Sequence, residues 1–329
     1  MEAYLGVDVG SVSTKFAVLD RNNELVTTLY LMTQGKPIEM VQQGLRQIEQ
    51  QLPRDFDICG VATTGSARYL AGVILGADIV KNEITTHAVA ALSYIPDVQT
   101  VLEVGGQDSK IIIIRDGVVI DFGMNTVCAA GTGSFLDHQA LRLNMSIGEF
   151  SQMALKSKSP VRIAGRCTVF AESDMVHKQQ MGHRIEDIVY GLCQALVRNF
   201  LNNVGSGKEV RFPVAFQGGV AFNRGIVRAF QEELGTEVIV PPHHEVMGAI
   251  GAAMLVHEEV VGNGRKTGFR GFGISDIEYN TSSFECKSCP NLCEIARLSI
   301  DGRVLAQWGG RCDIWERNPS GEGSKQEQS

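Results

Sequence analysis

Several features that would assign this chain to a common class of protein are missing from its sequence. No apolar run approaches the ~20 residues that span a bilayer, and residues 1–4 carry no basic region ahead of an apolar one, as a secretory signal would. Basic residues are not in excess, because 30 Lys and Arg stand against 37 Asp and Glu, a net charge of -7. Since duplex nucleic acid usually binds to a basic face, we expect a cytoplasmic protein with no membrane and no nucleic-acid partner.

Two phosphate-binding signatures are also absent. Neither GxxxxGK(S/T) nor GxGxxG occurs, which excludes a P-loop and argues against a dinucleotide site. The 329 residues are 44% hydrophobic and 20% charged, as in a globular protein of two domains or two lobes. The 36 glycines indicate tight turns where the backbone approaches a ligand.

Eight residues of the sequence, Asp8 to Lys15, recur in altered form as Glu103 to Lys110. The blocks align without a gap, with an acidic residue first, Gly third, Ser or Thr seventh and Lys last. Each block follows an apolar strand and precedes another strand and a turn. The repeat therefore predicts two similar lobes, each with one acidic-glycine hairpin. The alternative is two ordinary hairpins that agree by chance.

Alternating strand and helix patterns predict an α/β fold. We expect lobe I at 1–95, lobe II at 96–262 with its last helix returning to lobe I, a Cys-rich extension at 263–317, and a disordered tail at 318–329. Predicted strands are 4–9, 15–20, 25–30, 58–63, 111–114, 214–217 and 238–240. Predicted helices are 37–52, 83–92, 134–143, 169–180, 185–203 and 246–257, the last with small residues on one face.

Two facing hairpins suit a nucleotide triphosphate held between lobes. Turn amides can bind phosphate oxygens, carboxylates at strand ends can hold Mg²⁺ directly or through water, and positioning with charge neutralisation is most of what phosphoryl transfer needs. We assign Mg²⁺ binding to Asp8 and Glu103 and orientation of the attacking water to Asp108. The predicted phosphate-binding residues are Gly10, Ser11, Ser13, Thr14, Lys15, Gly105, Gly106, Gln107 and Ser109.

A third glycine turn follows the predicted strand 214–217 and precedes a helix. It is placed to receive an adenosine, while residues 241–242 and 245–249 would close the other side of that pocket. The predicted adenosine-binding residues are Gly218, Gly219, Val220, Asn223 and Glu245. Alone, such a turn is a weak signal.

Together these motifs resemble the actin, Hsp70 and sugar-kinase superfamily. Within it, residues 103–110, 125–135 (NTVCAAGTGSF) and 165–173 (GRCTVFAES) resemble the activators of 2-hydroxyacyl-CoA dehydratases and the ATPase subunits of benzoyl-CoA reductases, over about residues 3–257. The resemblance implies a two-lobed, actin-like (ribonuclease H-like) ATPase fold. We add Gly131, Thr132 and Gly133 to the nucleotide-binding residues. The segment after about residue 265 has no counterpart in short activators.

Cys128 and Cys167 each precede a predicted helix. A helix N-terminus favours negative charge, so both thiols should ionise readily, and a [4Fe–4S] cluster needs four thiolates. One chain supplies two here, and a two-fold homodimer would supply four; the resemblance implies the same shared cluster. The alternative is a pair of buried structural thiols.

The extension carries four further cysteines, Cys286, Cys289, Cys293 and Cys312. Four thiolates suffice for a tetrahedral zinc site or a second [4Fe–4S] cluster, and a small segment with few apolar residues needs such a staple. We favour structural zinc. Free surface thiols are the alternative, and Cys59 and Cys193 are interpreted as small buried residues.

The resemblance implies an oxygen-sensitive, ATP-hydrolysing electron-transfer protein. It would take an electron from reduced ferredoxin or flavodoxin and pass it to an iron–sulfur partner enzyme: a 2-hydroxyacyl-CoA dehydratase, a benzoyl-CoA-type reductase or a double-cubane cluster protein. The alternatives are a sugar kinase of the same fold, for which no acceptor-facing base stands out, and a non-redox ATPase that acts by binding a partner.

Overall fold

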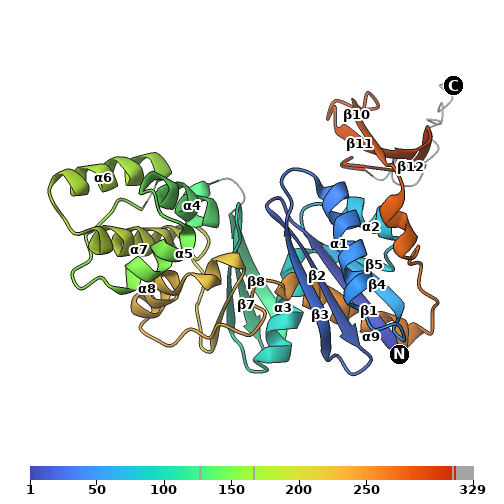
Figure 1. Cartoon of the computed structure of the whole chain (residues 1–329), viewed down its shortest axis with the longest axis horizontal. Helices are drawn as coiled ribbons and strands as arrows, with labels where there is room; N and C mark the ends of the chain where they lie inside the picture. Colours follow the sequence, from blue (N-terminus) through green and yellow to red (C-terminus); the bar gives the residue numbers. More distant parts are fainter. Residues whose placement is uncertain (126–127, 166, 313–314, 316–329) are drawn as a thin grey trace.

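The computed structural model describes residues 1–125, 128–165, 167–312 and 315. Figure 1 shows two α/β lobes side by side and a small third sheet against the first lobe, on the side away from the second. The strand orders are β3-β2-β1-β4-β5 in the first lobe, β8-β7-β6-β9 in the second and β10-β11-β12 in the extension. None of the helices in these ranges is both long and apolar enough to cross a membrane.

The elements follow one another along the chain in these groups. The first lobe holds β1 (Glu2–Val9), β2 (Ser13–Asp20), β3 (Leu25–Met32), α1 (Pro37–Gln51), β4 (Asp57–Thr64), α2 (Arg68–Leu75), β5 (Ile79–Val80) and α3 (Glu83–Tyr94). The second lobe holds β6 (Thr100–Val104), β7 (Ser109–Arg115), β8 (Val118–Asn125), η1 (Ala129–Gly131), α4 (Gly133–Arg142), α5 (Ile147–Leu155), α6 (Thr168–Gln180), α7 (Ile185–Asn203), β9 (Val214–Gln217), η2 (Gly219–Phe222) and α8 (Arg224–Leu234). Helix α9 (Met247–Asn263) precedes the extension, which holds η3 (Phe272–Asp276), β10 (Asn280–Glu285), β11 (Glu294–Ile300) and β12 (Arg303–Trp308).

The repeated sequence blocks occupy the same place in both lobes, which confirms the predicted duplication. In each lobe the acidic first residue of the block pairs across an antiparallel hairpin with the lysine that ends it. In both turns the glycine amide donates a 3.0 Å hydrogen bond to the carbonyl three residues later. The strand pairs are Asp8–Lys15 and Glu103–Lys110, and the turn bonds run from Gly10 to Ser13 and from Gly105 to Asp108.

Helix α9 packs closely against both β1 and α3 because it carries small residues on the facing side, as predicted. A Cβ atom on Gly251 would lie 1.9 Å from the Thr86 carbonyl oxygen of α3, and one on Gly6 of β1 would lie 1.9 Å from the Ala249 carbonyl oxygen. Neither site accepts a side chain without moving backbone. These contacts fix α3, which lies beside the second lobe (Figure 1), relative to the first-lobe sheet.

The structure differs from the predicted elements in several segments, of which three bear on the ends of the two lobes. Residues 238–240 form no extended strand, and a single parallel bridge joins Ile239 to Ala215. Helix α9 continues past the predicted end at residue 257 to Asn263 and stops at Gly264, whose φ of 60° is left-handed. The extension folds as a three-stranded antiparallel sheet, and its Ile274 and Leu298 join the buried first-lobe cluster that includes Leu45.

We predict that Gly251→Ala destabilises the protein while Gly262→Ala, on the same helix, does not. The first change forces a methyl group onto the Thr86 carbonyl, whereas nothing lies within 4 Å of the second position. Overpacking should lower the free energy of unfolding by about 2 kcal/mol or more, and alanine in open helix should raise it by up to ~1 kcal/mol. Urea denaturation measures both, and equal stability of the two variants would contradict the close contact.

Candidate functional site

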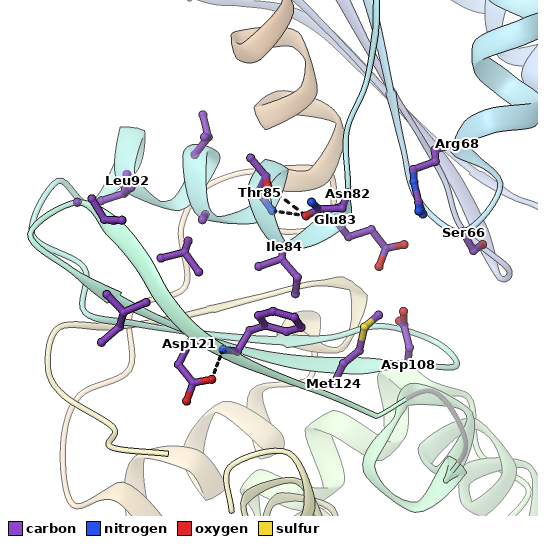
Figure 2. Close-up of a pocket in the computed structure, with 17 residues that line it drawn as sticks. Ser66, Arg68, Asn82, Glu83, Ile84, Thr85, Leu92, Asp108, Asp121 and Met124 are labelled. Carbon is purple, nitrogen blue, oxygen red and sulfur yellow. Dashed lines mark hydrogen bonds between the residues drawn. The ribbon is translucent and has the colours of Figure 1, made fainter. Parts of the chain in front are cut away.

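Carboxylates and lysines from both hairpins meet at the bottom of the interlobe cleft. Lys15 Nζ lies 3.0 Å from Asp8 Oδ2. Lys110 Nζ contacts three carboxylates, at 2.9 Å from Glu103, 2.8 Å from Asp108 and 2.9 Å from Glu83 at the start of α3. Figure 2 shows Glu83 and Asp108 on opposite sides of the groove between α3 and the second-lobe sheet.

Burial and charge act against each other on these groups. Burial alone would raise the pKa of Asp8, but Lys15 and other neighbouring cations hold it below its usual value. For Glu103 and Glu83, burial prevails over Lys110 and raises the pKa of each. Burial would lower the pKa of Lys110, yet its carboxylates keep that pKa well above the usual value. Of these three carboxylates, only Asp8 has a lowered pKa, so it favours the anionic form and suits a cation.

Above these carboxylates the two turns face a small cavity of about 50 Å³. Backbone amides at such a turn form an anion-binding nest. The predicted residues that line it are Asp8, Gly10, Ser11, Ser13, Lys15, Glu103, Gly105, Gly106, Gln107, Asp108 and Gly219. Thr14 and Ser109 do not reach it, because both are buried in strands, where the Thr14 hydroxyl is 2.9 Å from that of Thr33.

A second cavity, of about 400 Å³, adjoins the first and shares Gly106 and Gly219 with it. Of the predicted residues it is also lined by Gly133, Val220 and Asn223, together with parts of α4 and α5. Asn223 caps α8, its side chain accepting the Gly225 and Ile226 amides. Gly131, Thr132, Gly218 and Glu245 line neither cavity.

Sequence reasoning missed three residues of the buried network. Glu83 binds Lys110, Gln217 Nε2 lies 2.8 Å from His87 Nδ1, and His87 lies next to Asp8, since a Cβ on Gly248 would touch both side chains. Gln217 belongs to β9 and His87 to α3, so this contact joins the lobes. The only available signal was the acidic residue that opens the predicted helix 83–92.

A groove of about 890 Å³ extends from this network between α3 and β8 (Figure 2). Its polar end carries Ser66, Arg68, Asn82, Glu83 and Asp108 (Figure 2). Asn82 accepts the Thr85 amide as the cap of α3, and both carboxylates bind Lys110. The remainder is mainly apolar: Ile84, Ala88, Val89, Leu92, Val118, Val119, Ile120, Phe122 and Met124.

The loops that carry Cys128 and Cys167 lie together over α7. Asn125 forms two hydrogen bonds with the first loop. Its side chain donates to the Cys128 carbonyl at 2.7 Å and accepts from the Cys128 amide at 2.9 Å. Asn199 of α7 donates to the Gly165 carbonyl at 2.6 Å, and its Oδ1 lies 2.9 Å from where a Cβ on Gly131 would stand. Asn199 therefore hydrogen-bonds the second loop and packs closely against the first.

The thiols are distributed over three places in the described part of the chain. Cys128 and Cys167 are half-buried in the second lobe, the four extension cysteines lie beside the third sheet, and Cys59 is half-buried on β4. Cys193 is fully buried in the second-lobe core, as predicted. In the described ranges, no three Cys, His, Asp or Glu side chains converge closely enough, as they stand, to hold a metal ion.

The buried His87 predicts a pH dependence of stability. Burial, reinforced by Lys110, lowers its pKa from 6.5 to about 4, so the unfolded chain binds this proton first as pH falls. Stability is lost between pH 6.5 and 4, by roughly 3 kcal/mol in total. In nucleotide-free protein, His87→Gln should therefore lose less unfolding free energy than the wild type between about pH 7 and 4.5. Equal losses in urea titrations would refute this.

Comparison with known proteins supports the nucleotide site. The 2-hydroxyisocaproyl-CoA dehydratase activator of Clostridioides difficile is 34% identical over 261 residues, 78% of this chain and 95% of that protein. The (R)-2-hydroxyglutaryl-CoA dehydratase activating ATPase of Acidaminococcus fermentans is 34% identical over 260 residues, 78% and 97% of the two chains. The solved structure of the Clostridium difficile activator with bound ADPNP has a TM-score of 0.72 at 32% identity, covering 80% of this chain and 97% of that one.

The actin-like fold expected from the sequence is confirmed. An ADPNP-bound relative with this fold supports nucleotide binding in the cleft. Residues 5–256 match the BadF/BadG/BcrA/BcrD ATPase family. The chain belongs to that family of ATPases.

Proposed function

We propose that this protein is a homodimeric, ATP-hydrolysing activator that transfers single electrons. Reduced ferredoxin or flavodoxin would be the donor, and an iron–sulfur enzyme the acceptor: a 2-hydroxyacyl-CoA dehydratase, a benzoyl-CoA-type reductase or a double-cubane cluster protein. Relatives that are named activators of acyl-CoA dehydratases support the activator role.

One observation carries the proposal: the second phosphate turn is bonded directly to the segment that follows Cys128. The Gly105 carbonyl accepts the Gly133 amide at 2.8 Å. The Gly106 carbonyl accepts both the amide and the hydroxyl of Ser134, at 2.8 and 2.6 Å. Movement of this turn with the nucleotide's phosphates would therefore shift the start of α4 and the Cys128 loop.

The cysteine loops fit an iron–sulfur cluster shared by two copies. Cys128 and Cys167 precede η1 and α6, and Cys167 is the N-cap of α6, a 13-residue helix. Unpaired amides at a helix start favour the negative charge of a thiolate-ligated cluster. When bound, the cluster supplies one-electron chemistry, and two thiols from each chain complete its four ligands.

Exposed apolar side chains beside Cys167 support a second copy at this place. Val169 and Phe170, in the first turn of α6, are each 67% exposed. Such a pair next to a proposed shared cluster is suited to burial between copies. Burial there would also keep water away from the cluster.

The free energy needed for uphill transfer of one electron is within what ATP can supply. Moving one electron uphill by roughly 200 mV needs on the order of 5 kcal/mol. ATP binding and hydrolysis would supply this by displacing the phosphate turn. The chain's own residues position the phosphates, through the turn amides, and the metal, through Asp8 and Glu103, while Asp108 faces the attacking water.

The lining of the groove beside Asp108 weighs against a sugar kinase. A sugar site needs several hydrogen-bonding groups for the hydroxyls, yet here Asn82, Glu83 and Asp108 already bond within the protein. The rest of the groove is mainly apolar. The second candidate is a non-redox ATPase, which would use the same interlobe cleft and the same link between the phosphate turn and α4, without a cluster.

We predict that Cys128→Ser and Cys167→Ser each abolish the cluster while nucleotide binding is retained. Purified without oxygen, wild-type protein should carry about four iron atoms per dimer, absorb near 400 nm and bleach in air. Cys59→Ser, a half-buried thiol on β4, is the control and should keep its iron. Iron and sulfide assays with ATP titration measure the result. Full iron in both loop variants would exclude these ligands, and iron-free wild type would favour the non-redox ATPase.

A matched pair of valines tests the dimer. Val169→Asp should convert the protein to monomers and remove its iron, because a charge would be buried at the proposed interface. Val261→Asp, on α9 with 63% of its side chain exposed against 67% for Val169, should leave both properties unchanged. Light scattering after anaerobic chromatography measures the oligomeric state, and an iron assay of the same fractions measures the cluster content. A dimeric, iron-bearing Val169→Asp variant would place the interface elsewhere.

A further inference from the structure

The third sheet gathers all four extension cysteines at one end. Strand β10 ends just before Cys286 and β11 begins just after Cys293, with Glu285 paired to Glu294. The Cys286 amide donates to the Cys293 carbonyl at 2.8 Å. The strands thus bring two cysteines that are seven positions apart into backbone contact.

The fourth cysteine returns to the same end through β12, which stops at Trp308. Gly309 then packs so closely that a Cβ there would lie 2.7 Å from the Glu294 carbonyl oxygen, and its φ is 103°. A Cβ on Gly310 would lie 3.5 Å from Ile295. These glycines lead the chain over the start of β11 and towards Cys312.

A hydrogen bond from the aromatic side chain that follows Cys312 in the sequence holds the Cys286 sulfur. Trp315 Nε1 donates to Cys286 Sγ at 3.2 Å. Hydrogen bonds from outer groups orient the ligands of a metal ion. Cys286 itself is buried, so this bond helps to fix the direction of its sulfur.

We propose that Cys286, Cys289, Cys293 and Cys312 bind one Zn²⁺ as a structural tetrathiolate site. The ion would displace the thiol protons and hold each sulfur at about 2.3 Å. Cys289 and Cys312 are exposed, so their side chains can rotate towards the ion at small cost. The strands supply the backbone placement and the ion supplies the final convergence.

The location favours zinc over a second iron–sulfur cluster. The third sheet lies on the far side of the first lobe from α4 and α6, which follow the second-lobe cysteines (Figure 1). A redox centre there would be remote from Cys128 and Cys167. Zinc has no redox chemistry and would serve to fasten the ends of three strands.

The test uses the full chain in which Cys128→Ser and Cys167→Ser remove the proposed iron ligands of the second lobe. After anaerobic purification and dialysis against EDTA, elemental analysis should find about one zinc per chain and no iron. Adding Cys289→Ser or Cys312→Ser should remove the zinc, whereas adding Cys59→Ser should not. Replacement by Co²⁺ should give the visible bands of a tetrahedral thiolate complex.

A second measurement guards against misfolding of the variants. The Cys128→Ser, Cys167→Ser protein stripped of zinc by a thiol reagent, then reduced, should unfold at a lower temperature and recover when Zn²⁺ is returned. Iron and sulfide that persist in the double variant and disappear with Cys312→Ser would overturn zinc in favour of a cluster. Absence of both metals, or zinc unaffected by Cys289→Ser and Cys312→Ser, would overturn the site. None of these results depends on iron at Cys128 and Cys167.

Discussion

The hydrogen bonds between the second phosphate turn and the first residues of α4 are the constraint on which the rest depends. The turn needs Gly105 and Gly106 because a Cβ atom at either position would lie 2.7 Å from another side chain, Asp108 Oδ1 for the first and Val12 of the first-lobe hairpin for the second. Its amides can face the phosphates while its carbonyls are held by Gly133 and Ser134. Each peptide group is rigid, so a rotation that moves its amide also moves its carbonyl. The amides that face the phosphates and the carbonyls that hold α4 therefore move together.

A second constraint is electrostatic and acts across the cleft. Lys110 is buried among carboxylates from β6, the turn and α3, and removing any one of them would leave a buried charge less well compensated. Mg²⁺ bound by Asp8 or Glu103 would alter this balance. Since Glu83 belongs to α3, its ion pair with Lys110 links that helix directly to the second-lobe hairpin.

The parts of the fold that repeat could be predicted from the sequence. The spacing from Asp8 to Lys15 and from Glu103 to Lys110 predicted both hairpins, because a carboxylate and a lysine seven positions apart pair across a tight turn. It was insufficient for His87 and Gln217, whose importance arises only when α3 and β9 meet. The strand expected at 238–240 was wrong because apolar composition alone cannot show whether a neighbouring strand offers a full ladder. Strand β8 was not predicted, and four of its five apolar side chains, those of Val118, Ile120, Phe122 and Met124, are exposed.

Because of the extension, the region matched by the family model and the region that shares one buried core end at different residues. The family match ends at residue 256, but Ile274 and Leu298 lie in the same buried cluster as Leu45, and Asp78 accepts the Gly268 amide and the Thr267 hydroxyl. Removing the residues after 256 would expose apolar surface on α1 that the extension covers in the full chain. The region matched by the family model is therefore smaller than the region that contributes to the first-lobe core.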